Sequence, residues 1–489
     1  MHAFLALFFT LCSIFAHQNS EEQMIHNDTI CAISTAQGGA IGVIRVSGPI
    51  AIEAVSRIFA PIGGKPLKER RNFSLTFGKI FSNGGEFIDE VLVSVFRAPH
   101  SYTGEESVEI SCHGSSYILQ RVLQLLIGQG CRLAEPGEYT QRAFLNGKMD
   151  LSQAEAVADL ISSATSATHR MAMNQMRGGF SRELSVLRDK LLHLTSLMEL
   201  ELDFSDHEEL EFADRTELSQ IADEIEQVIS RLANSFSVGN ALKNGVPVAI
   251  IGETNAGKST LLNALLNEEK AIVSDVHGTT RDVIEDTVNL HGTTFRFIDT
   301  AGIRQTTDVV ESIGIERTFQ KIGQADIILW MIDTDNSELR TQSLGLKSSL
   351  LPHLEDKNLI ILFNKCDKVS SEQLSEWEAA FADVDAPKLI LSAKHRKGLD
   401  ELETLLVKTA ALPEISQSDV IVTNVRHYEA LIRALDSIHR VQSGLQMDLS
   451  GDFVSQDLRE CIHHLSDIVG EVSNDSVLQN IFRHFCIGK

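Results

Sequence analysis

Residues 252–259 read GETNAGKS and match the pattern GxxxxGK[ST]. The apolar run VPVAIIG ends at Gly252, as a buried strand would, and the segment STLLNALL, typical of a helix, begins at Ser259. In such a loop the glycines let backbone N–H groups wrap a phosphate chain, the lysine reaches the terminal phosphates, and the serine hydroxyl binds Mg²⁺. The alternative is a glycine turn with an incidental lysine, and the strand–loop–helix context argues against it. The sequence therefore predicts a phosphate-binding loop.

Four more apolar runs follow the loop, at 295–299, 326–333, 359–364 and 388–392 (FRFID, DIILWMID, LIILFN and KLILS). Helical segments separate them, which is typical of a parallel sheet in an α/β domain. Three of the runs end in polar motifs, and the ends of parallel strands meet at one edge of a sheet. We therefore expect these motifs to share one site.

The motifs select the nucleotide. Asp299-Thr-Ala-Gly302 offers a carboxylate to the Mg²⁺ shell and a glycine N–H to the γ-phosphate. In Asn364-Lys-Cys-Asp367 the aspartate can accept hydrogen bonds from guanine N1–H and the 2-amino group, donors that adenine lacks at that edge. Ser392-Ala-Lys394 would close the base pocket. Each motif alone could be a turn, but together and in this order they predict GTP binding.

A switch segment is expected between the loop and Asp299. It contains Gly278-Thr-Thr-Arg-Asp282, in which Thr280 is the candidate second Mg²⁺ ligand; the alternative is a polar turn. Ile303 stands where a Ras-like enzyme has a glutamine that orients the attacking water, so either hydrolysis is very slow or another group supplies this function. Asp308 and Glu311 are acidic candidates, each with the alternative of a solvated carboxylate.

No arginine occurs in the phosphate loop, and the switch arginine Arg281 adjoins Asp282. A bound monovalent cation is therefore a candidate to neutralise charge between the β- and γ-phosphates. Asn255 offers it a side-chain oxygen; the alternative is that Asn255 only stabilises the loop.

Composition narrows the class of protein. The 489 residues carry a formal net charge of −24, with 43% hydrophobic and 22% charged residues, which excludes a largely disordered chain. This charge argues against a protein that coats nucleic acid, although a local basic site or a basic partner stays open. Seven scattered cysteines without a CxxC pair indicate neither a disulfide framework nor a zinc site, and suit a reducing compartment.

The start of the chain is unusual. The apolar run at residues 3–16 has about the length of a signal peptide, but no Lys or Arg precedes it. We expect residues 1–23 to be an extension from a mis-assigned start; a targeting segment is the alternative.

Hydrophobic patterns divide the rest of the chain into domains. Short β-branched runs between glycine pairs from Asn27 to about Tyr139 predict an α+β domain. Apolar stripes at steps of three and four then predict long helices, first at Leu184–Met198 and Leu218–Leu232, and again after Pro413. Helical segments thus flank the α/β block, which predicts a helical domain with an inserted α/β domain.

Several stretches resemble the MnmE (TrmE) family of tRNA-modifying GTPases. They are GVIRVSG, SYTGEESVEI, EPGEYTQRAFLNGKMDLSQAEAVADLI, AIVSDVHGTTRDV and the ending Phe485-Cys-Ile-Gly-Lys489, and the likeness runs from Met24 to the end. The resemblance implies a multidomain α/β protein with the following parts. An N-terminal folate-binding-like dimerisation domain spans 24–140, a helical domain spans 141–243 and 414–489, and a Ras-like P-loop GTPase domain with a mainly parallel sheet is inserted at 244–413.

The same resemblance implies the function. We expect a cytoplasmic homodimer that, with a flavin-dependent partner of the MnmG (GidA) type, adds an aminomethyl or carboxymethylaminomethyl group to C5 of the wobble uridine of certain tRNAs. Hydrolysis would be stimulated by K⁺ and by pairing of two GTPase domains, with Glu311 orienting the water. A one-carbon tetrahydrofolate, as the 5-formyl or methylene form, is the further cofactor implied.

The predicted site residues follow. For GTP they are Asn255, Ala256, Gly257, Lys258, Ser259, Thr260, Ser274, Asp275, Val276, His277, Gly278, Thr279, Thr280, Asp299, Thr300, Ala301, Gly302, Asn364, Lys365, Asp367, Ser392, Ala393 and Lys394. For Mg²⁺ they are Ser259 and Thr280, and for K⁺ Asn255 and, by resemblance, Ser274, Val276 and Thr279. By resemblance alone, Arg45, Glu109, Lys148 and Lys489 bind folate, and Cys486 is a functional thiol with an inert thiol as the alternative.

Two other classes of function compete with the enzyme. A GTP-switched binding module, such as a ribosome-assembly factor, would carry a basic RNA-binding domain, which the acidic balance does not favour. A GTP-dependent scaffold is the third.

Overall fold

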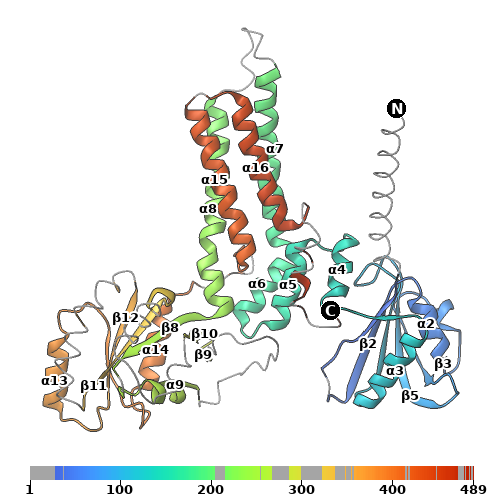
Figure 1. Ribbon diagram of the computed structural model, residues 1–489, viewed down its shortest axis with the longest axis horizontal. Helices are drawn as coiled ribbons and strands as arrows, with labels where there is room; N and C mark the ends of the chain where they lie inside the picture. The colour runs from blue at the N-terminus through green and yellow to red at the C-terminus, as the bar shows by residue number, and fades with distance from the viewer. Residues whose placement is uncertain are drawn as a thin grey trace, which may run out of the picture. The chain divides into compact units, whose positions relative to one another are not determined.

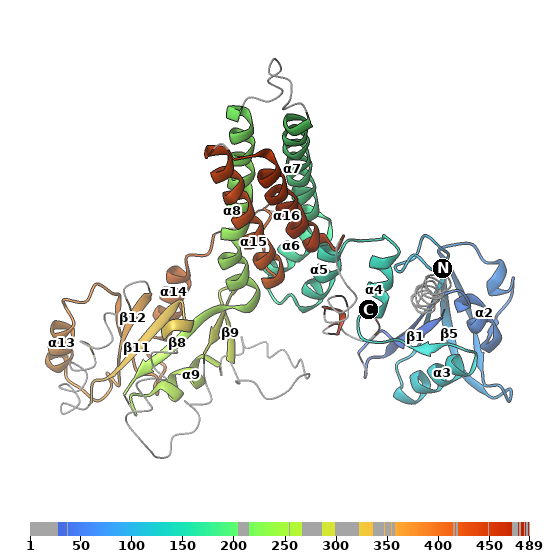
Figure 2. The same ribbon diagram turned by 45° about the horizontal axis from the view of Figure 1, so that its top comes forward.

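The computed structural model describes most of the chain in two compact units. One unit comprises residues 1–161, 175–188 and 462–489, and the other 162–174 and 189–461 (Figures 1 and 2). The described residues are 28–36, 38–203, 215–253, 255–266, 286–298, 322–335, 347, 354, 357–413, 416, 419–447, 449–471, 478, 481–483, 485 and 488. Residues 1–23 lie outside them.

A seven-stranded sheet forms the N-terminal part of the first unit, in the order β3-β4-β5-β6-β2-β1-β7. Its strands are β1 (Ile30–Ile33), β2 (Ile41–Ser47), β3 (Phe59–Pro61), β4 (Ser74–Phe81), β5 (Phe87–Phe96), β6 (Ser107–His113) and β7 (Arg132–Leu133). Neighbours are antiparallel, except that β7 runs parallel to β1. The predicted α+β domain is confirmed.

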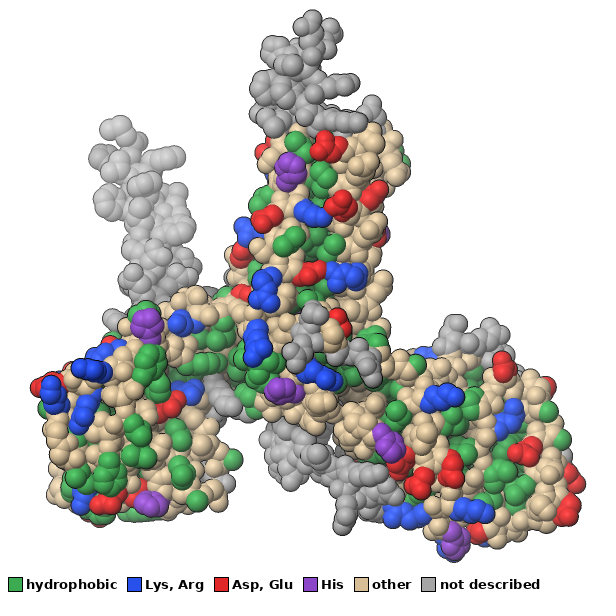
Figure 3. Space-filling view, turned by 180° about the vertical axis from the view of Figure 1, so that it is seen from behind, with side chains coloured by type: hydrophobic (Ala, Val, Ile, Leu, Met, Phe, Trp, Pro, Cys, Tyr) green, Lys and Arg blue, Asp and Glu red, His purple; other side chains and the backbone are tan. Residues whose placement is uncertain are grey.

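Alternation along the strands gives this sheet two different faces. Buried residues such as Ile44, Val93 and Ile110 pack with helices α2 (Ala51–Ile58) and α3 (Ser116–Gly128) (Figure 1). On the other face Leu75 and Phe77 are exposed, beside residues such as Leu92 and Ile41. Figure 3 shows hydrophobic side chains spread over this domain. Among the described residues, the part of this face on β4 and β5 is therefore apolar and exposed.

Arg142 of helix α4 (Glu138–Leu145) is only 2% exposed. It links Asp28, just before β1, to that helix. Its guanidinium donates to the Asp28 side chain and backbone, to Glu105 at 3.2 Å and to Glu138 at 2.9 Å. Arg132 binds the same Asp28 and Glu138 carboxylates. Burial by itself would raise the pKa of Glu138, but hydrogen bonds from Arg132, the Glu135 backbone and Arg142 outweigh it and lower that pKa.

The end of the chain packs against this N-terminal part. Phe482 and Phe485 share a core cluster with Leu151 of helix α5 (Leu151–Ser162). Gly137 (φ +71°) meets the same phenylalanines so closely that a Cβ there would lie 2.7 Å from the Phe482 carbonyl oxygen. Ser34 donates a hydrogen bond to the Gly488 carbonyl at 3.2 Å.

The predicted amphipathic helices form. They are α7 (Gly179–Asp203), α8 (Arg215–Asn244), α15 (Val425–Gln446) and α16 (Gly451–Val469), and they are accompanied by a shorter helix, α6 (Ser166–Met176), which was not predicted. Leu184 to Met198 make the buried stripe that was predicted on α7. On α8, Leu218, Ile225 and Leu232 of the predicted stripe are buried, but Ile221 and Val228 are half-buried and Ala222 and Ile229 are buried in their place. The buried stripe therefore steps by four and three instead of three and four. Helices α8 and α15 lie side by side (Figure 1).

The second unit contains a six-stranded sheet in the order β13-β12-β11-β8-β10-β9. Its strands are β8 (Val246–Gly252), β9 (Asp286–Leu290), β10 (Thr293–Phe297), β11 (Ile327–Asp333), β12 (Asn358–Asn364) and β13 (Lys388–Ile390). All pairs are parallel except β9 with β10. The five predicted strands and the mainly parallel sheet are confirmed; β9 was not predicted.

Both faces of this sheet are covered, which explains why its strands are apolar throughout. One core includes α9 (Lys258–Leu266) and α14 (Leu399–Ala410), and the other includes Trp377 of α13 (Ser371–Ala380) with Trp330 and Phe381. None of the described helices has an apolar stretch long enough to cross a membrane.

We predict that Arg142→Ala lowers the stability of the N-terminal sheet by about 3–5 kcal/mol, because it leaves three carboxylates without their buried cation. Glu138 has a lowered pKa, so its contribution is present above the ordinary carboxyl pKa of about 4.3 and is lost as the pH falls through the lowered value. The penalty should therefore shrink in acid. Hydrogen exchange of peptides from β1 and β7 at pH 7.5 and pH 4 measures both effects.

Arg57→Ala is the control for this prediction. Arg57 is exposed and pairs with Glu53 one helical turn away, so its loss should leave the stability close to that of the wild type. Equal penalties in the two variants, or a penalty for Arg142→Ala that grows in acid, would contradict the assigned role of Arg142.

Candidate functional site

The phosphate loop connects the end of β8 to the start of α9 and has an unusual backbone. Gly252 (φ +140°), Asn255 (φ +66°) and Gly257 (φ +99°) have positive φ, which glycine and, among other residues, asparagine tolerate best. A Cβ on Gly257 would lie 2.3 Å from the Asn364 side-chain nitrogen. The loop therefore needs glycine at 257 for space as well as for conformation.

Lys258 is the first residue of α9, and its ammonium group reaches back over the loop. Its Nζ donates to the carbonyls of Gly252 (2.7 Å) and Glu253 (2.6 Å). Ser259 and Thr260 follow in the first turn of the helix. A lysine and the unpaired N–H groups of a helix N-terminus together make a site that favours phosphate.

Asn364 is 3% exposed and links three loops, two of them through its side chain and one through its backbone carbonyl. Its Nδ2 donates to the Ala256 carbonyl at 2.7 Å, and its Oδ1 accepts from the Ala393 backbone N–H at 3.0 Å. Its own carbonyl accepts from the Thr334 hydroxyl at 2.6 Å. The structure thus brings the phosphate loop and two of the predicted base motifs to one edge of the sheet.

Asp367 lies close to the hydrogen bonds of Asn364, because Ser392, next to Ala393, contacts it. Ser392 donates a hydrogen bond to its Oδ1, and this bond lowers the pKa of Asp367. His395 Nε2 is 3.4 Å from Oδ2. The carboxylate is therefore ionised at neutral pH and able to accept hydrogen bonds from two neighbouring N–H donors.

Lys365 has positive φ (+67°), and its Nζ lies 2.5 Å from the carboxylate of Asp333, at the end of β11. Lys394 is exposed. Asp333 and His395 were not among the predicted residues. Asp333 could have been found, since it ends the predicted strand next to the one that carries Asn364; nothing in the sequence singled out His395.

The remaining predicted nucleotide residues lie outside the described part of the chain. They are Ser274, Asp275, Val276, His277, Gly278, Thr279, Thr280, Asp299, Thr300, Ala301, Gly302 and Glu311.

A second group of predicted residues lies on the open face of the N-terminal sheet. Arg45 of β2 is paired in register with Glu109 of β6, and the guanidinium donates to Glu109 Oε1 from Nε (3.0 Å) and Nη2 (2.8 Å). The guanidinium carbon is 5.4 Å from the centre of the Tyr102 ring and 5.6 Å from that of Tyr139. Arg45 is thus held by a carboxylate and two aromatic rings, and the rings were not predicted.

The tyrosines are themselves fixed. Burial raises the pKa of Tyr139 well above its ordinary value, so its hydroxyl stays protonated and donates to the Arg45 carbonyl at 2.8 Å. The Tyr102 hydroxyl is 2.9 Å from that of Thr140. Lys148 donates to the Pro99 carbonyl at 2.9 Å, on the segment that leads to Tyr102. Lys489 and Cys486 lie outside the described residues, but their neighbour Gly488 contacts Ser34, just after β1.

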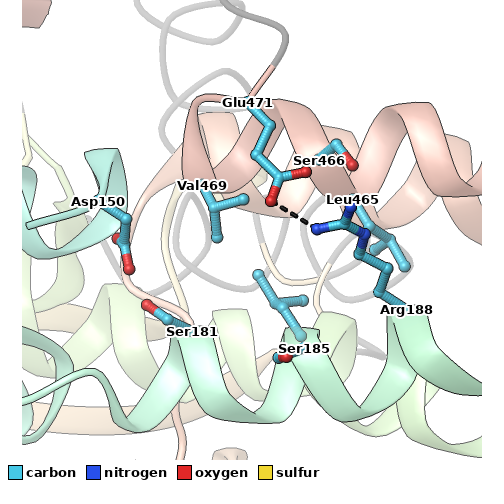
Figure 4. A pocket seen from close by; sticks show the side chains of 9 residues that line it. Asp150, Ser181, Ser185, Arg188, Leu465, Ser466, Val469 and Glu471 are labelled. Atoms are coloured by element: carbon cyan, nitrogen blue, oxygen red, sulfur yellow. Dashed lines mark hydrogen bonds and ion pairs between the residues drawn. The ribbon is translucent and has the colours of Figure 1, made fainter. Parts of the chain in front are cut away.

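A cavity of about 220 Å³ lies between α7 and the end of α16 (Figure 4). Arg188 and Glu471 form an ion pair of 2.5 Å on its wall, and Asp150, Ser181 and Ser466 also line it. No residue predicted for a site lines this cavity.

Two family models match the chain. The model described as the MnmE helical domain matches residues 151–486, and that of the GTP-binding protein TrmE N-terminus matches residues 29–148. The tRNA modification GTPase MnmE of Phocaeicola vulgatus is 66% identical over 501 residues, covering 96% of this chain and 100% of the relative. The one from Christiangramia forsetii is 51% identical over 473 residues, covering 95% and 99%.

Solved structures match a smaller part. Aquifex aeolicus Era bound to GDP·AlF₄⁻ is 29% identical and covers 39% of this chain and 66% of its own, with a TM-score of 0.26. The G domain of the T. maritima FeoB iron transporter is 28% identical and covers 34% and 98%, with a TM-score of 0.24. These scores are too low to add to the argument, which rests on the near full-length relatives and on the geometry of the loops. The chain belongs to the MnmE (TrmE) family of tRNA modification GTPases.

Proposed function

We propose that the chain hydrolyses GTP in the cytoplasm to drive modification of the wobble uridine of certain tRNAs at C5. A flavin-dependent partner of the MnmG (GidA) type would act with it to add an aminomethyl or carboxymethylaminomethyl group. GTP binding is supported by the two side-chain hydrogen bonds of Asn364, which hold the phosphate loop and the two base motifs at one edge of the sheet. The tRNA part is supported by the name that the near full-length relatives carry.

Nucleoside analysis of tRNA from a deletion strain tests this function. We expect the C5 modification to disappear and to return when the full chain is supplied. Unchanged wobble uridines would leave a GTP-switched binding module or a scaffold as the better description.

The residues fit the expected metal ions. Ser259, beside Lys258 in the first turn of α9, offers Mg²⁺ a hydroxyl oxygen, and Thr280 would supply the second. Asn255 sits in the loop with φ +66°, where its amide oxygen would bind K⁺ together with oxygens of Ser274, Val276 and Thr279. A bound cation supplies positive charge next to the phosphates. Glu311 would orient the attacking water, and pairing of two GTPase domains would close the site.

The N-terminal residues fit a one-carbon tetrahydrofolate. Arg45 offers a fixed cation for a carboxylate of the glutamate tail, and Glu109 offers acceptors for N–H groups of the pterin. Lys148 and Lys489 would add cations, and the contact between Ser34 and Gly488 supports a role for the chain's end. The exposed apolar sheet face beside Arg45 supports a homodimer formed by this domain, and Cys486 would act near the modification site.

We predict that replacing Na⁺ by K⁺ at constant ionic strength raises GTP turnover, and that Asn255→Gly abolishes the response. Glycine removes the amide oxygen but keeps the left-handed backbone. The loss should be roughly 10²–10³-fold, the effect of removing one fixed charge-stabilising group. Steady-state GTP hydrolysis measures it. Asn263→Ala, an exposed asparagine on α9, is the control and should keep the K⁺ response.

The catalytic assignment has a separate test. Glu311→Ala should lower turnover and leave GTP affinity nearly unchanged. Equal turnover in Na⁺ and K⁺ would reject the cation mechanism, and normal turnover in Glu311→Ala would remove that residue from the mechanism.

We predict that Asp367→Asn lowers GTP affinity roughly 10–100-fold, because it removes charge-assisted hydrogen bonds to the base. It should raise affinity for xanthosine triphosphate, whose 2-carbonyl can accept from the new amide. Fluorescent nucleotide titration measures both. Asp335→Asn removes a nearby carboxylate that pairs with Lys368 and should change neither affinity. If both variants weaken GTP binding equally, Asp367 does not read the base.

We predict that Arg45→Ala weakens binding of 5-formyltetrahydrofolate to the full chain by roughly 10–100-fold, for the same charge-assisted reason. Removal of Lys489 alone should weaken it as well. Isothermal titration gives the affinities. Lys79→Ala removes a cation of strand β4 in the same sheet, one that pairs with Glu90; it is the control and should have no effect. Full affinity without Lys489 would show that the terminus takes no part.

A further inference from the structure

A short cationic loop follows β3. Residues 65–71 (KPLKERR) contain four cations and one acid, a net charge of about +3 in a chain of −24. We propose that this loop and the adjacent Phe73, which we call the basic loop surface, contact the phosphate backbone and an unstacked base of the tRNA substrate. The inference rests on the proposed tRNA function and assigns it a binding surface.

Contacts with the rest of the N-terminal domain fix the backbone of the loop. Leu67, in the 3₁₀ helix Leu67–Glu69, is 2% exposed and belongs to the N-terminal core. Arg97 donates to the carbonyls of Lys68 (2.7 Å) and Arg70 (3.2 Å), and the Asn72 side chain accepts from the Arg97 backbone N–H at 2.9 Å. The loop therefore presents its cations without further ordering, which lowers the entropic cost of binding.

The cations of the loop are largely uncompensated. Lys65, Lys68 and Arg71 are exposed. Lys68 is 3.7 Å from Glu53, which Arg57 binds more closely at 2.8 Å. Among the described residues, Lys65, Arg70 and Arg71 form no ion pair; the Arg70 Nε donates to the Lys65 carbonyl. Figure 3 shows a group of Lys and Arg side chains on this domain, at the left of the view. Exposed and unpaired cations are what a phosphate backbone binds.

Phe73 adds a feature that charge alone does not explain. It is 70% exposed and has φ +58°, a left-handed conformation that is unfavourable for a bulky residue. Its backbone N–H donates to Val95 and to the Asn72 side chain, and its ring meets Phe96 edge to face at 6.1 Å. The ring is thus held outward and is exposed enough for a base to stack on it.

RNA suits this combination better than a protein does. Single-stranded parts of an RNA present phosphates and unstacked bases within one nucleotide of each other, and the basic loop surface offers cations two residues from a fixed aromatic ring. The rest of this acidic chain repels RNA, so a local cationic surface would also set the orientation of the bound molecule.

The test measures affinity of the full-length chain for a tRNA transcript by fluorescence anisotropy at several salt concentrations. We expect the double variant Arg70→Ala, Arg71→Ala to bind at least about tenfold more weakly and to lower the slope of log K against log salt by about 1–2. The charge-matched control is Arg433→Ala with Arg459→Ala, two exposed arginines of α15 and α16, and should stay close to wild type.

Phe73 is tested in the same assay. Phe73→Asn tolerates the left-handed backbone and removes the ring, so it should weaken binding and leave the salt slope unchanged. Phe73→Tyr keeps the ring and should bind as wild type does. Light scattering of each variant reports its oligomeric state.

Three results would overturn the inference. They are wild-type affinity in both the arginine and Phe73→Asn variants, equal losses in the charge-matched control, or a loss that accompanies a change of oligomeric state, which would assign the surface to a second copy of the chain. If the wild-type chain binds no tRNA the inference also fails, whereas the proposed function is judged separately by nucleoside analysis of the deletion strain.

Discussion

The amide of Asn364 is the interaction on which the nucleotide edge of the second sheet depends. One group both donates to the phosphate loop and accepts from the loop after β13, so neither can move without breaking a buried hydrogen bond. Leaving a buried amide without its hydrogen-bond partner costs about 1–3 kcal/mol. The two loops are therefore held by Asn364 together or not at all. Gly257 completes it, because only a residue without a Cβ lets the amide approach.

The N-terminal sheet follows a different rule. Its polar site is built on the exposed face of regular strands, so its precision comes from register. Arg45 and Glu109 face each other because β2 and β6 pair at those positions, and the two tyrosines hold the arginine from the side. A shift of one residue would turn Arg45 into the core, which the alternating burial of Ile44 and Val46 forbids.

Local sequence patterns predicted much of the second sheet and of its phosphate-binding loop. Apolar runs located five strands of the second sheet, and the glycine-rich pattern located its loop, since both depend on neighbours in sequence. Strand β9 was missed because its residues, DTVNL, are mixed in character and pair only at the sheet edge. His395 and the tyrosines around Arg45 were missed because their partners are remote in sequence, whereas Asp333 could have been found because it ends a predicted strand. No spacing rule brings Tyr139 to Arg45; only the packing of α4 on the sheet does so.

The contact between Ser34 and Gly488 joins residues 454 positions apart. A ribosome adds roughly 5–20 residues per second, so the partner of Ser34 is synthesised roughly 20–90 s after it. During that interval the surface around Gly137 that receives Phe482 and Phe485 has no cover of its own. The N-terminal unit is therefore completed only after Phe482, Phe485 and Gly488 have been synthesised, and a chain that lacks these residues would leave an apolar surface open to chaperones and to aggregation.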